Sequence, residues 1–186
     1  MQTPFLIGEK IYLRPVDMED IDNFVEWLND PEVRQYLSLV SPFNKTREKD
    51  FIDDLYKDER KTVLGIVMKE DDRLIGNIGL SKVSLSNRNC CLGIVIGDKS
   101  CWSQGCGTEA LKLMLGYAFD QLNLHRVYLT VLDFNSRAIR AYEKAGFKKE
   151  GTYRKHMYKN GKYCDLYYMG ILKDEWRKMN HENPDL

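Results

Sequence analysis

The sequence predicts one α/β domain, with a mixed central sheet of about seven strands and helices on both of its faces. Three observations lead to this fold class. Seven short segments have the apolar, β-branched character of strands, helical apolar stripes lie between several of them, and no repeat, low-complexity tract or Pro/Ser-rich linker interrupts the 186 residues. A chain of this length suits one sizeable domain. We therefore expect a single domain over 1–186, with its core at about 9–176 and a tail at 177–186.

The first part of the chain combines one strand with three helices. Residues 10–16 alternate apolar and polar side chains, as a half-buried strand does. Asp17 is a suitable N-cap for a helix over 18–30, whose apolar residues recur at helical spacing. Pro31 opens a short second helix that ends at Leu37, and Thr46 is the expected cap of a third.

Strands dominate the middle of the chain. The segments 61–70, 73–85 and 90–96 are rich in β-branched and apolar residues and are separated by polar turns, which predicts three strands. A helix follows, because apolar side chains recur from Leu111 to Leu122 at i, i+3, i+4, i+7, i+8 and i+11.

The last part of the chain alternates between strand and helix. Residues 125–132 predict a strand, and a short helix over 136–145 precedes Gly146, which suits the left-handed residue after a helix. Two final strands, at 147–158 and 163–172, flank an Asn-Gly pair that is typical of a tight hairpin turn.

Composition excludes several classes of protein. Hydrophobic residues make up 43% and charged residues 30%, which is typical of a soluble globular protein. Basic and acidic residues balance at 28 each, so we expect no nucleic-acid or membrane partner. The N-terminus lacks the layout of a secretory signal, the cysteines form no CxxC pair, and the histidines show no ligand spacing. We therefore expect a cytoplasmic protein with reduced thiols and no metal site.

Two glycines, Gly105 and Gly107, stand at the start of the helix that carries the 111–122 stripe. Glycine there lets the unpartnered amides of the first helical turn close on an anion. A phosphate or pyrophosphate ligand would explain both glycines, and so would an ordinary strand-to-helix turn. The segment is no Walker loop, because no Gly-Lys-Ser/Thr follows, and Ala110 replaces the third glycine of a dinucleotide fingerprint.

Two blocks resemble the GCN5-related N-acetyltransferase (GNAT) family. The segment WSQGCG at 102–107 is similar to the family's pyrophosphate loop, Gln/Arg-x-x-Gly-x-Gly/Ala, except that Trp102 replaces its first residue. The segment NSRAIRAYEKAGF at 135–147 matches the family's Asn-x-x-Ala-x-x-x-Tyr-x-x-x-Gly-Phe. The resemblance covers nearly the whole chain. The tryptophan is similar to the branch of ribosomal-protein N-terminal acetyltransferases and spermidine acetyltransferases.

The resemblance implies a mostly antiparallel GNAT-like sheet that splays between its fourth and fifth strands, and acetyl-CoA as the acyl-donor substrate. Tyr142 would be the general acid, a phenol that protonates the departing thiolate. The implied donor site consists of Ile94, Val95, Ile96, Trp102, Ser103, Gln104, Gly105, Cys106, Gly107, Thr108, Asn135 and Lys144. Lys99, Arg137 and Arg140, together with Lys144, lie near its phosphate end and either add positive charge or remain solvated.

The sequence leaves open which group accepts the proton of the attacking amine. Many relatives carry Glu just before the apolar run of the fourth strand, where this chain has Cys91. Asp165 and a chain of water molecules are the other candidates. No cysteine, Cys106 included, has the setting of a nucleophile, so direct attack in a ternary complex is favoured.

Acidic residues crowd the first two helices between Asp17 and Glu32. They form either an acidic wall for a cationic acceptor or a solvated helix face. We expect a protein or peptide N-terminal amine as the acceptor, with a polyamine (spermidine or spermine) as the alternative. A non-catalytic acyl-CoA-binding sensor is the third reading. The family also suggests a homodimer, paired through the last strands.

Overall fold

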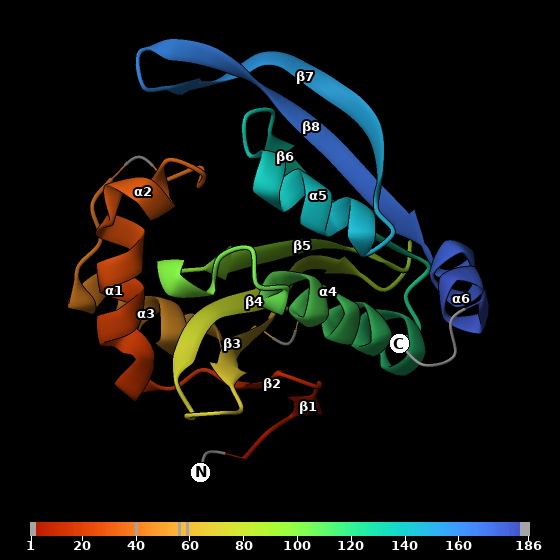
Figure 1. Ribbon diagram of the computed structural model, residues 1–186, viewed down its shortest axis with the longest axis horizontal. Helices are drawn as coiled ribbons and strands as arrows, with labels where there is room; N and C mark the ends of the chain where they lie inside the picture. Colours follow the sequence, from red (N-terminus) through yellow and green to blue (C-terminus); the bar gives the residue numbers. More distant parts are fainter. Residues whose placement is uncertain (1–2, 40, 56, 59, 183–186) are drawn as a thin grey trace.

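Eight strands form one mixed sheet in a computed structural model that describes residues 3–39, 41–55, 57–58 and 60–182 (Figure 1). They are β1 (Leu6–Ile7), β2 (Ile11–Pro15), β3 (Thr62–Met68), β4 (Leu74–Ser84), β5 (Asn89–Ile96), β6 (Arg126–Leu132), β7 (Lys148–Lys159) and β8 (Lys162–Leu172). Their order is β1-β2-β3-β4-β5-β6-β8-β7, and all neighbours are antiparallel except β5 and β6. The predicted fold class is confirmed. The strand that the sequence does not predict is β1, whose two residues are too few to show a period.

The α-helices of the described residues are α1 (Ile21–Asn29), α2 (Pro31–Arg34), α3 (Lys45–Leu55), α4 (Cys106–Gly116), α5 (Ser136–Lys144) and α6 (Lys173–Glu182). Three differ from expectation. The helix α2 ends at Arg34 rather than at the expected Leu37, because the amides of Tyr36 and Leu37 donate only three residues back, to Val33 and Arg34, as in turns. The cap of α3 is Asn44 rather than Thr46, because the Asn44 side chain accepts a hydrogen bond from the Arg47 amide at 2.9 Å. Residues 177–182, which belong to the expected tail, continue α6, and this helix buries Trp176 in the core. The rest of the expected tail, 183–186, lies outside the described residues.

The helices cover the two faces of the sheet in two groups. α1, α2 and α3 pack on the face that carries Tyr12 of β2, while α4, α5 and α6 pack on the face that carries Leu13. Successive side chains of a strand point to opposite faces, so one strand serves both cores. Figure 1 shows α1, α2 and α3 grouped together, apart from α4 and α5.

A buried ion pair fixes the start of α1 to the sheet. Arg14 of β2 donates to both carboxylate oxygens of Asp20, at 2.7 Å each, and the two side chains are 7% and 6% exposed. Asp20 also accepts a hydrogen bond from the Asp17 amide at 2.9 Å. The Asp17 side chain caps the short helix that leads into α1, which confirms the predicted cap.

β5 and β6 pair only at one end. Residues 89–91 of β5 pair with residues 126–128 of β6. Beyond Cys91, β5 stays on β4 as far as Ile96, whereas β6 stays on β8 as far as Leu132. The two strands therefore open a wedge within the sheet, which is the predicted splay between the fourth and fifth strands of the sequence.

β7 and β8 form a long hairpin that extends beyond the helices (Figure 1). Its turn residues, Asn160 and Gly161, have φ values of 49° and 80°, as the predicted Asn-Gly turn requires. Near the tip, the Lys159 ammonium donates to the Leu39 carbonyl at 3.2 Å. The hairpin thus contacts the segment that follows α2.

Candidate active site

The wedge between β5 and β6 opens into a cavity of about 400 Å³. Residues 92–96 of β5 and 130–132 of β6 form its two strand walls. The rest of the lining comes from the loop before α4, the first half of α4, the helix α5, Leu166 of β8, and α2 with the turn that follows it. The predicted donor-site segments, from three separate parts of the sequence, therefore border one space.

The open edge of β5 presents the backbone groups of alternate residues. The Gly97 amide donates to β4 at 2.9 Å, whereas the neighbouring Ile96 carbonyl accepts from the Trp102 indole at 2.8 Å. Successive residues of a strand direct their polar groups to opposite sides. The amide and carbonyl of Ile94 therefore face the wedge, as those of Ile96 do. The backbone of Val95 is directed at β4, and its side chain borders the cavity.

The helix α4 begins without a side-chain cap. Its N-cap residue is Gly105, with a left-handed φ of 91° that favours glycine. The amides of residues 106–108 form the first turn and have no helical partner. A Cβ added to Gly107 would come no closer than 3.6 Å to Ile96, an ordinary contact, so packing within the protein does not require glycine there. The free amides and the space beside them fit an anion such as a phosphate.

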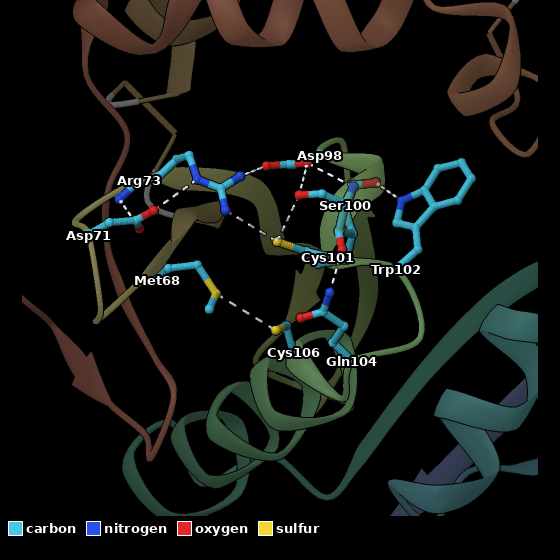
Figure 2. Close-up of polar contacts among 10 residues, drawn as sticks. Met68, Asp71, Arg73, Asp98, Ser100, Cys101, Trp102, Gln104 and Cys106 are labelled. Atoms are coloured by element: carbon cyan, nitrogen blue, oxygen red, sulfur yellow. Dashed lines mark hydrogen bonds and ion pairs between the residues drawn. The ribbon is translucent and has the colours of Figure 1, made fainter.

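Figure 2 shows the contacts that hold the turn before this loop. Asp98 accepts hydrogen bonds from Ser100 and forms an ion pair with Arg73. The Gln104 side chain donates to the Ser100 carbonyl. Cys106 is buried and its sulfur contacts that of a methionine in β3. The predicted donor-site residues Gln104 and Cys106 therefore have side chains engaged within the protein, and neither is among the residues that line the cavity.

Aromatic rings surround one arginine at the loop end of the cavity. The Arg137 guanidinium lies 3.5 Å from the ring centroid of Trp102 and 5.2 Å from that of Tyr36. Tyr36 in turn contacts Trp102 edge-on at 6.3 Å and Phe134 at 5.9 Å. Burial lowers the pKa of Arg137, and no carboxylate of the described residues pairs with it. The sequence gives no signal for Tyr36 or Phe134, because only the fold brings their segments together.

The helix α5 brings Asn135 and Tyr142 to the cavity. The Asn135 side chain caps α5 by accepting a hydrogen bond from the Ala138 amide at 3.2 Å. Two turns further on, Tyr142 is 7% exposed and packs edge-on against Phe147, with the ring centroids 5.9 Å apart. Burial raises the pKa of Tyr142 to about 12. The phenol therefore stays protonated at neutral pH and can donate a hydrogen bond, but it is not suited to accept a proton as a base.

The cysteines near the site are thiols. Cys91 is the last residue of β5 that pairs with β6, so it lies at the closed end of the wedge. Burial raises the pKa of both Cys91 and Cys106. Deprotonation at neutral pH is therefore disfavoured, and neither thiol is suited to act as a base or a nucleophile.

The four cations expected near the phosphate end have different surroundings. The Lys99 ammonium pairs with Asp30 at 2.8 Å and with Glu32 at 2.9 Å, and so is directed at α2. Arg140 and Lys144 line the cavity, but both are exposed. Among the described residues, three charged side chains border the cavity, and all three are cations of α5: Arg137, Arg140 and Lys144.

Other sequence candidates lie away from the cavity. Asp165 accepts a hydrogen bond from the Lys155 amide at 2.8 Å, in a bulge of β7. Among the acids of the first two helices, Asp20 is buried against Arg14, whereas Asp22, Asp30 and Glu32 pair with lysines near the surface. Four of the acids are therefore balanced within the protein, which favours a solvated helix face over an acidic substrate wall for the exposed ones.

The described residues contain no cluster of three His, Cys, Asp or Glu side chains placed to hold a metal ion. In the same part of the chain, every helix is too short or too polar to cross a membrane.

The chain is similar to known proteins in sequence. The family model described as the acetyltransferase (GNAT) domain matches residues 10–148. The probable N-acetyltransferase YjcK of Bacillus subtilis is 32% identical over 183 residues, which cover 91% of this chain and 98% of YjcK. The putative ribosomal N-acetyltransferase YdaF of the same organism is 27% identical, over 91% of this chain and 95% of YdaF.

A solved structure shares the fold. The spermidine N-acetyltransferase from Vibrio cholerae, in complex with CoA and spermine, superposes with a TM-score of 0.85 and 23% identity, over 91% of this chain and 99% of that one.

Proposed function

Because the chain belongs to the acetyltransferase (GNAT) family, we propose that it transfers the acetyl group of acetyl-CoA to the amino terminus of a protein or peptide. The acyltransferase class follows from the family. The acceptor and the residue roles are proposed from the cavity. One observation carries the proposal: an uncapped helix start, an open strand edge and a buried tyrosine border the same space.

The donor site is built mainly from backbone groups. The first-turn amides of α4 would bind the pyrophosphate of the donor, and Gly107 leaves room for it. The pantetheine arm is an extended chain with amides of its own, so it would add to the open edge of β5 at the amide and carbonyl of Ile94 and at the Ile96 amide, as a peptide adds to a sheet edge. The Ile96 carbonyl already accepts from the Trp102 indole. Asn135 and Lys144 would contact the same ligand from α5.

The chemical step forms a bond from the nitrogen of the neutral amine to the acetyl carbonyl carbon and breaks the bond from that carbon to sulfur. The nitrogen loses one proton, and the released sulfur gains one to leave as the thiol of CoA. The Ile94 amide faces the wedge and would donate to the carbonyl oxygen as negative charge develops there. Tyr142 would donate a hydrogen bond to the departing sulfur. A phenol of pKa about 12 gives up its proton to a thiolate of pKa ~8.5 only at a cost of ~5 kcal/mol, so this hydrogen bond matters most while the sulfur is becoming charged.

The choice of acceptor follows from the charges around the cavity. Its charged lining residues, among those described, are all cations. Cations repel a protonated amine, so this lining favours an acceptor whose amine is already neutral in solution. An α-amino group with pKa ~8 is about one-quarter neutral at pH 7.5, whereas an alkylamine with pKa ~10.4 is only about 0.1% neutral. This difference of roughly 200-fold favours a peptide N-terminus.

A polyamine is the second candidate acceptor. The observation in its favour is the likeness of the fold to the spermidine acetyltransferase of known structure. A direct test offers labelled acetyl-CoA together with spermidine, spermine, or peptides with Ser, Ala or Met at the N-terminus. Labelled product from a peptide, at a rate above that from the polyamines, supports the proposal. Product from polyamines alone would replace it with the second candidate.

The variant Tyr142→Phe separates an enzyme from a sensor that only binds acyl-CoA. The ring and its packing against Phe147 remain, and only the hydroxyl is lost. We expect kcat to fall by roughly 10- to 1,000-fold, while the Kd for CoA measured by calorimetry stays within about threefold. Wild-type protein that binds acetyl-CoA and acetylates no acceptor would favour the sensor and remove the role of Tyr142.

A further inference from the structure

The loop that begins α4 has no positive side chain of its own. Residues 102–108 read WSQGCGT. Lys99, three residues earlier, is held by Asp30 and Glu32. Backbone amides contribute partial charges only, whereas a diphosphate carries full negative charges. A ligand of this kind therefore needs a cation from another part of the fold.

Arg137 is placed to supply this charge. It comes from the first turn of α5 and lies on the ring of Trp102, the first residue of the loop, at 3.5 Å from the ring centroid. Tyr36 lies on the same guanidinium at 5.2 Å, and Phe134 supports Tyr36. These ring contacts use none of the N–H groups of Arg137, and no acceptor of the described residues takes a hydrogen bond from them, so they are available to an oxyanion.

The other cations of the cavity are held less firmly. Arg140 and Lys144 are exposed, and no described residue forms an ion pair with either. Arg137 is half-buried, stacked, and likewise without a carboxylate partner among the described residues. A side chain that is already ordered loses less entropy on binding than a mobile one. The unbalanced charge of Arg137 makes an anionic partner favourable as well.

We propose that Arg137 binds a phosphate group of the donor, and that Trp102 positions it to supply the charge that the loop lacks. The assignment rests on the proposed donor site and adds a residue to it. Arg137 would form a bidentate pair with phosphate oxygens beside the first-turn amides of α4. Trp102 then has two roles, since its indole also anchors the loop to the Ile96 carbonyl.

A purely structural role for Arg137 would give a different result in one experiment. Arg137→Met keeps an unbranched apolar stem on the Trp102 ring and removes the charge. Arg177→Met makes the same change of charge on the exposed surface of α6, away from the cavity. Calorimetry would measure binding of CoA and of pantetheine, which lacks the phosphates, to both variants and to wild type. Thermal melting of each protein would confirm that it is folded.

We expect Arg137→Met to weaken CoA binding by roughly 10- to 100-fold and to leave pantetheine binding within about threefold. Arg137→Lys should recover part of the CoA affinity, and Arg177→Met should bind both ligands as wild type does. Equal losses for CoA and pantetheine would show a packing role, and a loss in Arg140→Met instead would assign the phosphate to the other arginine. Either result overturns the assignment. Wild-type protein that binds no CoA would overturn the donor site itself.

Discussion

Replacing Asp20 by Asn removes the charge that balances Arg14 while it keeps the shape of the side chain. The carboxylate accepts two hydrogen bonds from Arg14, at 2.7 Å each, and one from the Asp17 amide, and the pair is 7% and 6% exposed. Removing one partner of a buried pair costs ~3–5 kcal/mol, because the other charge stays buried without compensation. For a chain of this size, each kcal/mol lowers the Tm by about 2–4 °C. We therefore expect Asp20→Asn to lower the Tm by roughly 6–20 °C.

The ion pair between Lys45 and Asp22 provides the matched control. Its N–O distance is also 2.7 Å, but both side chains are 71% exposed. The same chemical change, Asp22→Asn, should cost under ~1 kcal/mol, because water screens an exposed pair. Urea unfolding followed by far-ultraviolet circular dichroism would give the free energy of unfolding of both variants, and thermal melting would give the Tm.

Similar losses for Asp20→Asn and Asp22→Asn would refute the reasoning, since the two pairs share their distance and differ in burial. A second outcome tests the cause of the loss. Adding Arg14→Met to Asp20→Asn removes the uncompensated charge, so the double variant should recover part of the lost stability. A double variant that is less stable than Asp20→Asn would contradict the assigned cause.

Three further changes test the site. Lys99→Met should leave the CoA affinity measured by calorimetry within about twofold, because Lys99 pairs with two carboxylates. A loss of affinity as large as that expected for Arg137→Met would instead show that Lys99 contacts the phosphates. Gly105→Ala should cost ~1–2 kcal/mol in urea unfolding, because a φ of 91° strains any residue with a Cβ, and an unchanged stability would contradict this. The folded pKa of Tyr142, about 12, exceeds the unfolded value near 10, so its contribution to stability is complete below pH 10 and is lost as the pH rises towards 12. Tyr142→Phe should therefore show a smaller fall in Tm than wild type between pH 10 and 12. Equal falls in Tm would contradict the raised pKa of Tyr142 in the folded protein.

Local sequence signals predicted the parts of the fold that have local causes. Asp17 caps its helix and the Asn-Gly pair forms the hairpin turn, because each depends only on adjacent residues. The strand β1 has two residues and therefore no period. The start of α6 is marked by a capping residue rather than by a periodic pattern of apolar residues. Glu175, in the first turn of α6, accepts a hydrogen bond from the Leu172 amide at 2.9 Å, as the glutamate of a capping box does.

The candidate site was predictable only where a motif lies within one segment. The loop at 102–107 and the helix with Tyr142 are such segments, and the fold brings both to the cavity. The stack of Tyr36, Trp102 and Arg137 is different, because its members come from the turn after α2, the loop before α4 and the helix α5. No periodicity relates residues so far apart in the chain. Their meeting depends on how the helices pack on the opened sheet.

The opened sheet is the strongest link between this fold and the proposed chemistry. If β5 and β6 stayed paired beyond Cys91, the ladder would occupy the backbone groups of Ile94, each hydrogen bond contributing ~0.5–1.5 kcal/mol. Each strand is held along its other edge, because β4 pairs with β5 opposite Ile94 and β8 pairs with β6 opposite Val131. Closing the wedge would therefore require the two halves of the sheet to move together with the helices that pack on them. A ligand with amides of its own would replace the missing hydrogen bonds without moving either strand. The unpaired edge of β5 therefore lowers the stability of the sheet without a ligand and, for the same reason, leaves backbone groups free to bind one.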